Sequence, residues 1–99
     1  MPVVQIPTSA ATFVGTTPGE TYQLARTATI TTAGDGIRDF TTRADAADSA
    51  TWLIDGAITA GGIGVLTRGL NATLEIGATA TLSTQSAGVS MAGANSSFR

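Results

Sequence analysis

Ile58-Thr-Ala-Gly-Gly-Ile-Gly64-Val65 is one of three stretches of this chain that follow the same template. The other two are Ile30-Thr-Thr-Ala-Gly-Asp-Gly36-Ile37 and Leu82-Ser-Thr-Gln-Ser-Ala-Gly88-Val89. Each stretch begins with an aliphatic and a hydroxyl residue, and each ends with glycine followed by isoleucine or valine. Repeated units of this size are supersecondary elements that bury their apolar faces by stacking on one another. The repeat therefore predicts an architecture rather than an activity.

A second motif precedes each copy, and its apolar residues alternate along the chain. The motif reads Thr21-Tyr-Gln-Leu24, Thr51-Trp-Leu-Ile54 and Thr73-Leu-Glu-Ile76. Alternation with period two puts the apolar side chains on one face of a β-strand. No stretch has helical periodicity, and the many Gly, Thr and Ser residues disfavour helix. We therefore predict an all-β fold, a right-handed parallel β-helix (β-solenoid) of about three coils.

The predicted coils cover residues 20–49, 50–71 and 72–99, and residues 1–19 are expected to form an N-terminal β cap. Strands about 4.8 Å apart would stack equivalent side chains into columns. Four columns are predicted: Leu24, Ile54 and Ile76; Ile30, Ile58 and Leu82; Ile37, Val65 and Val89; and Tyr22, Trp52 and Leu74. Gly36, Gly64 and Gly88 are interpreted as corners that need either a positive φ or room for close-packed backbone.

The composition excludes several functional classes. A chain of 99 residues is one domain, and it contains no Cys and no His. Disulfides, thiolate or imidazole metal sites and a histidine general base are therefore absent. All five basic residues are Arg and the net charge is −2, so a nucleic-acid partner is not expected. The N-terminus does not resemble a Sec signal, and no apolar run reaches the roughly 18 residues of a membrane span.

The repeat motifs resemble the N-terminal β-helical region of bacterial haemolysin-type (RTX) calcium-binding proteins, and the passenger repeats of autotransporter adhesins. The resemblance covers roughly residues 20–91. It implies a secreted or cell-surface β-solenoid, and an RTX-like protein would leave by type I export without a Sec signal. The calcium-binding nonapeptide of that family is Gly-Gly-x-Gly-x-Asp-x-aliphatic-x. Its nearest match here starts at Gly61 and has Leu66 in place of the liganding Asp and Arg68 in the aliphatic position.

Two groups of acidic residues are candidates for chemistry. Asp35, Asp39, Asp45 and Asp48 form an acidic cluster that could supply oxygen ligands to Ca²⁺. Their spacing fits no known calcium loop, and turn-forming Asp residues are the simpler interpretation. Asp55 and Glu75 lie in neighbouring coils, where paired carboxylates could act on glycosides. Three short coils offer little groove, so we expect no enzymatic activity, no catalytic residues and no cofactor.

Tyr22 and Trp52 are the largest aromatic residues, and two interpretations apply to them. Exposed rings would stack on sugars, whereas buried rings would pack in the core. Their parity matches that of Leu24 and Ile54, which favours the core.

Residues 92–99 look like the start of a further turn, so no C-terminal cap is expected. An open solenoid end carries unpaired strand edges that template association with another chain. The sequence therefore favours a structural, self-assembling module whose partner is itself or the rest of a longer solenoid. Two alternatives stay open: an adhesin fragment that binds cell-surface glycans, and a segment of a trimeric phage or adhesin fibre.

Overall fold

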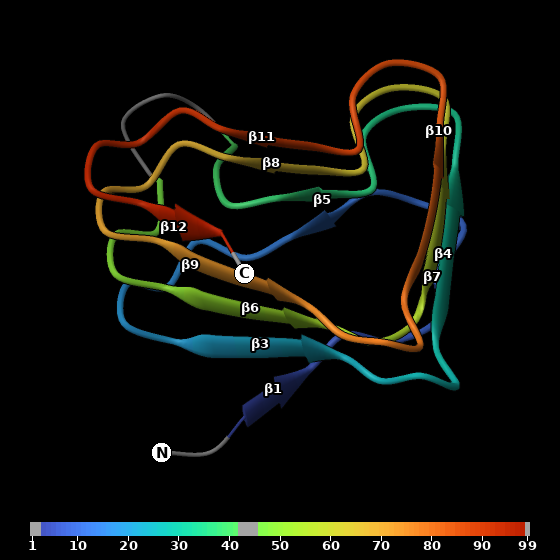
Figure 1. Ribbon diagram of the computed structural model, residues 1–99, viewed down its shortest axis with the longest axis horizontal. Coiled ribbons are helices and arrows are strands. Elements are labelled where there is room, and N and C mark those ends of the chain that lie inside the picture. The colour runs from blue at the N-terminus through green and yellow to red at the C-terminus, as the bar shows by residue number, and fades with distance from the viewer. Residues whose placement is uncertain (1–2, 42–45, 99) are drawn as a thin grey trace.

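The computed structural model describes residues 3–41 and 46–98, which form three parallel sheets wrapped into a triangular tube (Figure 1). Sheet A contains β1 (Val3–Gln5), β3 (Thr21–Leu24), β6 (Thr51–Ile54), β9 (Thr73–Ile76) and β12 (Ser97–Phe98). Sheet B contains β4 (Thr29–Thr32), β7 (Ala57–Ala60) and β10 (Thr81–Thr84). Sheet C contains β2 (Phe13–Val14), β5 (Ile37–Arg38), β8 (Val65–Thr67) and β11 (Val89–Met91). The described residues include no helix.

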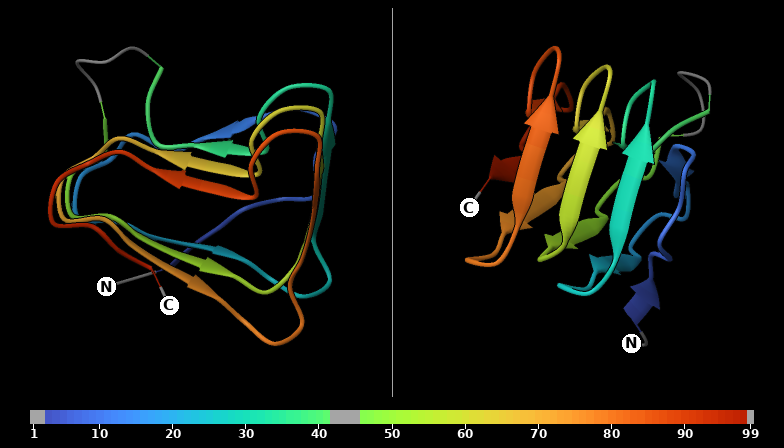
Figure 2. Two further views of the ribbon diagram at one scale, coloured as in Figure 1. Left: turned by 45° about the horizontal axis from the view of Figure 1, so that its top comes forward. Right: turned by 90° about the vertical axis from the view of Figure 1, so that its right-hand side faces the viewer.

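The chain visits the three sheets in turn, which makes each circuit one coil of a solenoid. Seen from the C-terminal end, it passes counter-clockwise from sheet A to B to C while it advances toward the viewer (Figures 1 and 2). The solenoid is therefore right-handed and has about three full coils, as the sequence predicted. Coil 1 contains β3, β4 and β5, coil 2 contains β6, β7 and β8, and coil 3 contains β9, β10 and β11.

The N-terminal segment covers the first coil on all three sides by continuing the strand pairing of the solenoid. β1 pairs with β3, Ser9 forms a parallel bridge to Ile30 in β4, and β2 pairs with β5. Residues 3–14 thus contact coil 1 on all three sides, and we call them the N-terminal coil. At the other end β12 pairs with β9 and begins a further circuit, as predicted for residues 92–99.

All four predicted columns are present in the observed strand register. Leu24 pairs with Ile54 and Ile54 with Ile76, and the other three columns follow from the same parallel ladders. The side chains of coils 1 and 2 in these columns are 0–4% exposed, and they form the core. Burial of this kind stabilises by roughly 1.5–3 kcal/mol per large aliphatic side chain. The interior is therefore a set of apolar stacks that run along the solenoid axis.

The repeated glycines allow close packing of backbone between coils. A Cβ on Gly64 would lie 2.5 Å from the carbonyl oxygen of Gly88, and one on Gly36 would lie 2.6 Å from that of Gly64. None of the three has a positive φ, so the second of the two predicted reasons holds. Gly88 has no coil above it, and a Cβ there would meet only Leu82, at 3.6 Å.

Positive φ values occur instead at a different corner, immediately before sheet A. Gly19, Ser49, Asn71 and Asn95 have φ between 56° and 73°, and each lies two residues before a sheet A strand. Their amides donate upward in a continuous ladder, from Gly19 to Asp48, from Ser49 to Leu70 and from Asn71 to Ala94. Asn and Gly tolerate the left-handed region better than most residues, which explains three of these four positions, whereas Ser49 has no such preference.

The glycine contacts predict different results for two matched substitutions. Gly64→Ala forces a methyl group against the backbone of coil 3 and should lower the free energy of unfolding by about 1–3 kcal/mol. Gly88→Ala meets open space and should leave that free energy unchanged or raise it by up to about 1 kcal/mol. Urea denaturation at low protein concentration, followed by Trp52 fluorescence, measures both. Equal decreases in the unfolding free energy of the two variants would contradict the close packing of Gly64 against the backbone of coil 3.

Candidate functional site

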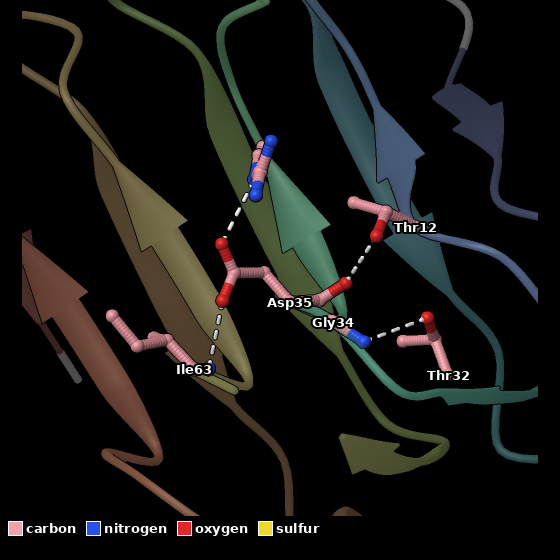
Figure 3. A network of polar contacts seen from close by, with 6 residues as sticks. Thr12, Thr32, Gly34, Asp35 and Ile63 are labelled. Atoms are coloured by element: carbon pink, nitrogen blue, oxygen red, sulfur yellow. Dashed lines mark hydrogen bonds and ion pairs between the residues drawn. The ribbon is translucent and has the colours of Figure 1, made fainter. Parts of the chain in front are cut away.

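Asp35 joins three successive coils at the corner between sheets B and C (Figure 3). Its Oδ1 accepts a hydrogen bond from the amide of Ile63 in coil 2 at 2.9 Å, and its Oδ2 accepts from Arg38 Nε at 2.8 Å. Its main-chain oxygen accepts from the Thr12 hydroxyl of the N-terminal coil at 2.6 Å. Both carboxylate oxygens of Asp35 are thus engaged by protein donors.

Asp39 makes a similar connection, but from inside the solenoid. Its side chain is fully buried after β5, where Oδ1 and Oδ2 accept from the amides of Arg68 and Gly69, each at 2.8 Å. Both donors belong to coil 2. Burial raises the pKa of Asp39 above its ordinary value, and the two amide hydrogen bonds oppose that rise. The carboxylate thus terminates backbone amides that would otherwise lie unpaired at this corner.

The structure does not bring the predicted calcium ligands together. Asp48 is exposed, and its Oδ1 accepts from the amide of Leu70 in coil 2 at 2.9 Å. Asp45 lies outside the described residues. Within residues 3–41 and 46–98 no three acidic side chains lie close enough to hold one metal ion. Asp35, Asp39 and Asp48 instead share one structural role, because each accepts an amide from the coil above it.

Asp55 and Glu75 do line one recess, at the corner where sheet A ends. The turn of coil 2 is two residues shorter than those of coils 1 and 3, so it lies further in (Figure 2). The recess has a volume of about 270 Å³, and its remaining lining residues are Leu53, Ile54, Ile76 and Gly77. The Asp55 carboxylate occupies the space that a side chain at position 77 would fill. Two carboxylates and aliphatic walls make this recess acidic, with no basic side chain in its lining.

The aromatic side chains pack inside the solenoid, as the parity of Tyr22 and Trp52 predicted. Their rings are stacked, with centroids 4.3 Å apart and an interplanar angle of 12°. Phe13 of the N-terminal coil meets both rings edge-on, at 5.8 Å and 6.4 Å. Tyr22 is 4% exposed and Trp52 is 0% exposed, so neither ring forms a platform for a sugar.

The two ends of the solenoid, within the described residues, carry unpaired strand edges and partly exposed apolar side chains. β10 and β11 are the last strands of sheets B and C, so one edge of each is unpaired. The apolar columns reach this C-terminal end partly uncovered, at Ile76, Leu82, Val89 and Met91. At the N-terminal end Val3, Val4 and Val14 are 37–41% exposed. Both ends therefore combine open strand edges with accessible apolar side chains.

Charge is almost absent from the same two ends. Residues 3–19 contain no charged side chain, and Glu75 is the single charged residue between positions 69 and 98. Soluble proteins commonly protect open strand edges with charged side chains or proline. Pro7 lies in the N-terminal coil, but between β1 and Ser9 rather than in a paired strand. The distribution of charge was readable from the sequence, although our prediction used only its total.

Comparisons with protein-family models, with curated proteins and with solved structures find no match to this chain. In the described residues no helix is long and apolar enough to cross a membrane.

The buried position of Asp39 predicts a dependence of stability on pH. Its pKa is higher in the folded chain than its ordinary value of 3.8. Protonation of Asp39 therefore stabilises the folded state relative to the ionised form. This contribution to the unfolding free energy is fully present below pH 3.8 and is lost as the pH rises through the raised pKa. Asp39→Asn abolishes the titration. The unfolding free energy of the native chain, relative to Asp39→Asn, should increase as the pH falls from about 7 toward 4. Urea denaturation of both proteins across this pH range measures the difference in unfolding free energy. A difference that stays constant or decreases as the pH falls would contradict the raised pKa of Asp39.

Proposed function

We propose that this chain is a non-enzymatic structural module that associates through the open ends of its solenoid. The observation that carries the proposal is that the two end coils, which contain Glu75 as their single charged residue within positions 3–19 and 69–98, also carry unpaired strand edges, at β10 and β11. A buried apolar column that ends at a partly exposed residue gains stability when a further coil covers it. Association at the ends removes both the open backbone edges and the exposed apolar surface.

We also propose that the module belongs to a secreted or surface-displayed bacterial protein of the RTX or autotransporter-adhesin type. The coil geometry and the Thr-rich outer face of sheet B support this assignment. Each coil is completed by a single chain, so a trimeric fibre with shared coils is not needed to form this core. Tyr22 and Trp52 are buried, so a glycan-binding site would need to lie on an outer face of the solenoid without these rings.

The proposal predicts association that depends on concentration and on the C-terminal end. Val89→Lys places a charge in a partly buried column of β11, from which the long side chain can reach solvent at the open end. Thr59→Lys is the matched control, because Thr59 is exposed on the outer face of the internal strand β7. Sedimentation velocity over a concentration series should show association for the native chain and Thr59→Lys, and its loss in Val89→Lys. Unchanged Trp52 emission verifies the fold. A native chain that stays monomeric at high concentration contradicts the proposal.

A further inference from the structure

We propose that the surface which covers the C-terminal end is the N-terminal coil of a second copy of this chain. This inference rests on the proposed self-association and adds the partner, the contact surfaces and the register. In the assembled state β1, Ser9 and β2 of one copy lie on β9, β10 and β11 of the next. The two-residue strand β12 occupies the position that β1 of the second copy takes.

The N-terminal coil is already built to contact a coil on three sides. Within one chain it pairs with β3, Ile30 and β5 in a parallel arrangement. Strand backbones carry hydrogen-bonding groups on both edges, so the opposite edges of this coil are free to pair again. Coil 3 has the same three sides in the same order around the tube, with the edges of β10 and β11 unpaired and the edge of β9 occupied by β12.

The columns also match when the intrachain register is continued across the junction. Val4 pairs with Tyr22 and Phe13 with Ile37. At the C-terminal end the first of these columns reaches Leu74 and then Phe98 of β12, and the second stops at Val89. A second copy would therefore place Val4 over Leu74 and Phe13 over Val89. Val4, which is 37% exposed, would take the place of Phe98 over the buried Leu74, and the partly buried Phe13 would cover the partly exposed Val89.

The sparse charge of both ends favours this partner over one with a charged binding surface. Residues 3–19 carry no charge and residues 69–98 carry only Glu75, so two copies meet without like-charge repulsion. Both halves of the contact are present on one chain and differ from each other. Such a head-to-tail interface does not close on itself along a straight solenoid, and it leads to filaments.

β12 is the one segment that blocks the arrangement, and it is weakly held. It pairs with β9 through Ser97 and Phe98 only, and Phe98 is 58% exposed. The Ser97 amide donates to Ala72 at 2.8 Å, while the contacts of Ser96 Oγ are longer, at 3.3 and 3.4 Å. Sheets B and C have no strand at this level. Displacement of β12 by the three-residue β1 therefore exchanges a shorter pairing for a longer one.

Disulfide trapping tests the register, because the chain contains no cysteine. The register places Gln5 of one copy beside Glu75 of the next, as Gln5 lies beside Gln23 within a chain. Within one chain β1 and β9 are separated by two strands, so residues 5 and 75 lie roughly 14 Å apart. A disulfide needs Cα atoms within about 7 Å, so Gln5→Cys with Glu75→Cys can link only different copies. This double variant should give a ladder of covalent oligomers on a non-reducing gel.

Two matched pairs control for geometry. Gln5→Cys with Gln23→Cys should close within one chain and give a monomer. Gln5→Cys with Leu53→Cys should give no ladder, because Leu53 lies on the internal strand β6. Mixing the two single variants Gln5→Cys and Glu75→Cys should give one mixed dimer and no longer product, which also tests the register if the double variant folds poorly.

Ser97→Pro tests the role of β12, since proline removes the amide that bonds to Ala72. Combined with Gln5→Cys and Glu75→Cys, it should increase the fraction of chain found in covalent oligomers. An unchanged or smaller fraction overturns the proposal that β12 competes with β1 of the second copy. Sedimentation separates the remaining outcomes. Association without the ladder overturns the proposed register and leaves self-association standing. A strict monomer overturns both proposals.

Discussion

The whole structure depends on one constraint, the in-register parallel stacking of equivalent residues at the spacing of β-strands. Each coil is too thin to enclose a core alone, so its inward side chains are buried by those of the coils above and below. Leu24, Ile54 and Ile76 illustrate the effect, because the first two are fully buried while Ile76, in the last complete coil, is only partly covered. Stability therefore accumulates along the axis, and the ends are its weakest points.

The polar features of the solenoid serve the same stacking. Asp35, Asp39 and Asp48 each accept an amide from the coil above, which satisfies backbone groups at corners where the strand ladders are interrupted. Gly36 and Gly64 let the backbones of neighbouring coils approach at the corner between sheets B and C, where Asp35 also lies. Together these contacts fix the coils laterally, while the apolar columns hold them along the axis. A carboxylate in such a position is a structural acceptor of hydrogen bonds from backbone amides.

The columns could be predicted from the sequence because their members share parity and follow the same Thr and Gly landmarks. The sequence predicts short strands in the N-terminal β cap, but their pairing with each side of coil 1 could not be predicted, since Val3 to Gln5 and Phe13 to Val14 lack those landmarks. The corner with left-handed φ values could not be predicted, because Gly19, Ser49 and Asn71 are different residue types and give no repeated signal. The repeated glycines at positions 36, 64 and 88 were the candidates for a positive φ instead. The amide partners of the Asp residues lie 22–30 positions away, so they become visible only once the register is known. The few charged residues near the two ends, which the sequence also shows, are consistent with the unpaired edges of β10 and β11.

Nuclear Overhauser contacts between side-chain methyl groups test the stacking most directly. The account predicts contacts between Leu24 and Ile54 and between Ile54 and Ile76, with none between Leu24 and Ile76, which are separated by about 9.6 Å. It also predicts that Ile30 contacts Ile58, and Ile58 contacts Leu82, in the same pattern on the next sheet. Close Hα–Hα contacts between β3 and β6, as in an antiparallel meander, together with missing contacts between Leu24 and Ile54, would contradict the structure described here.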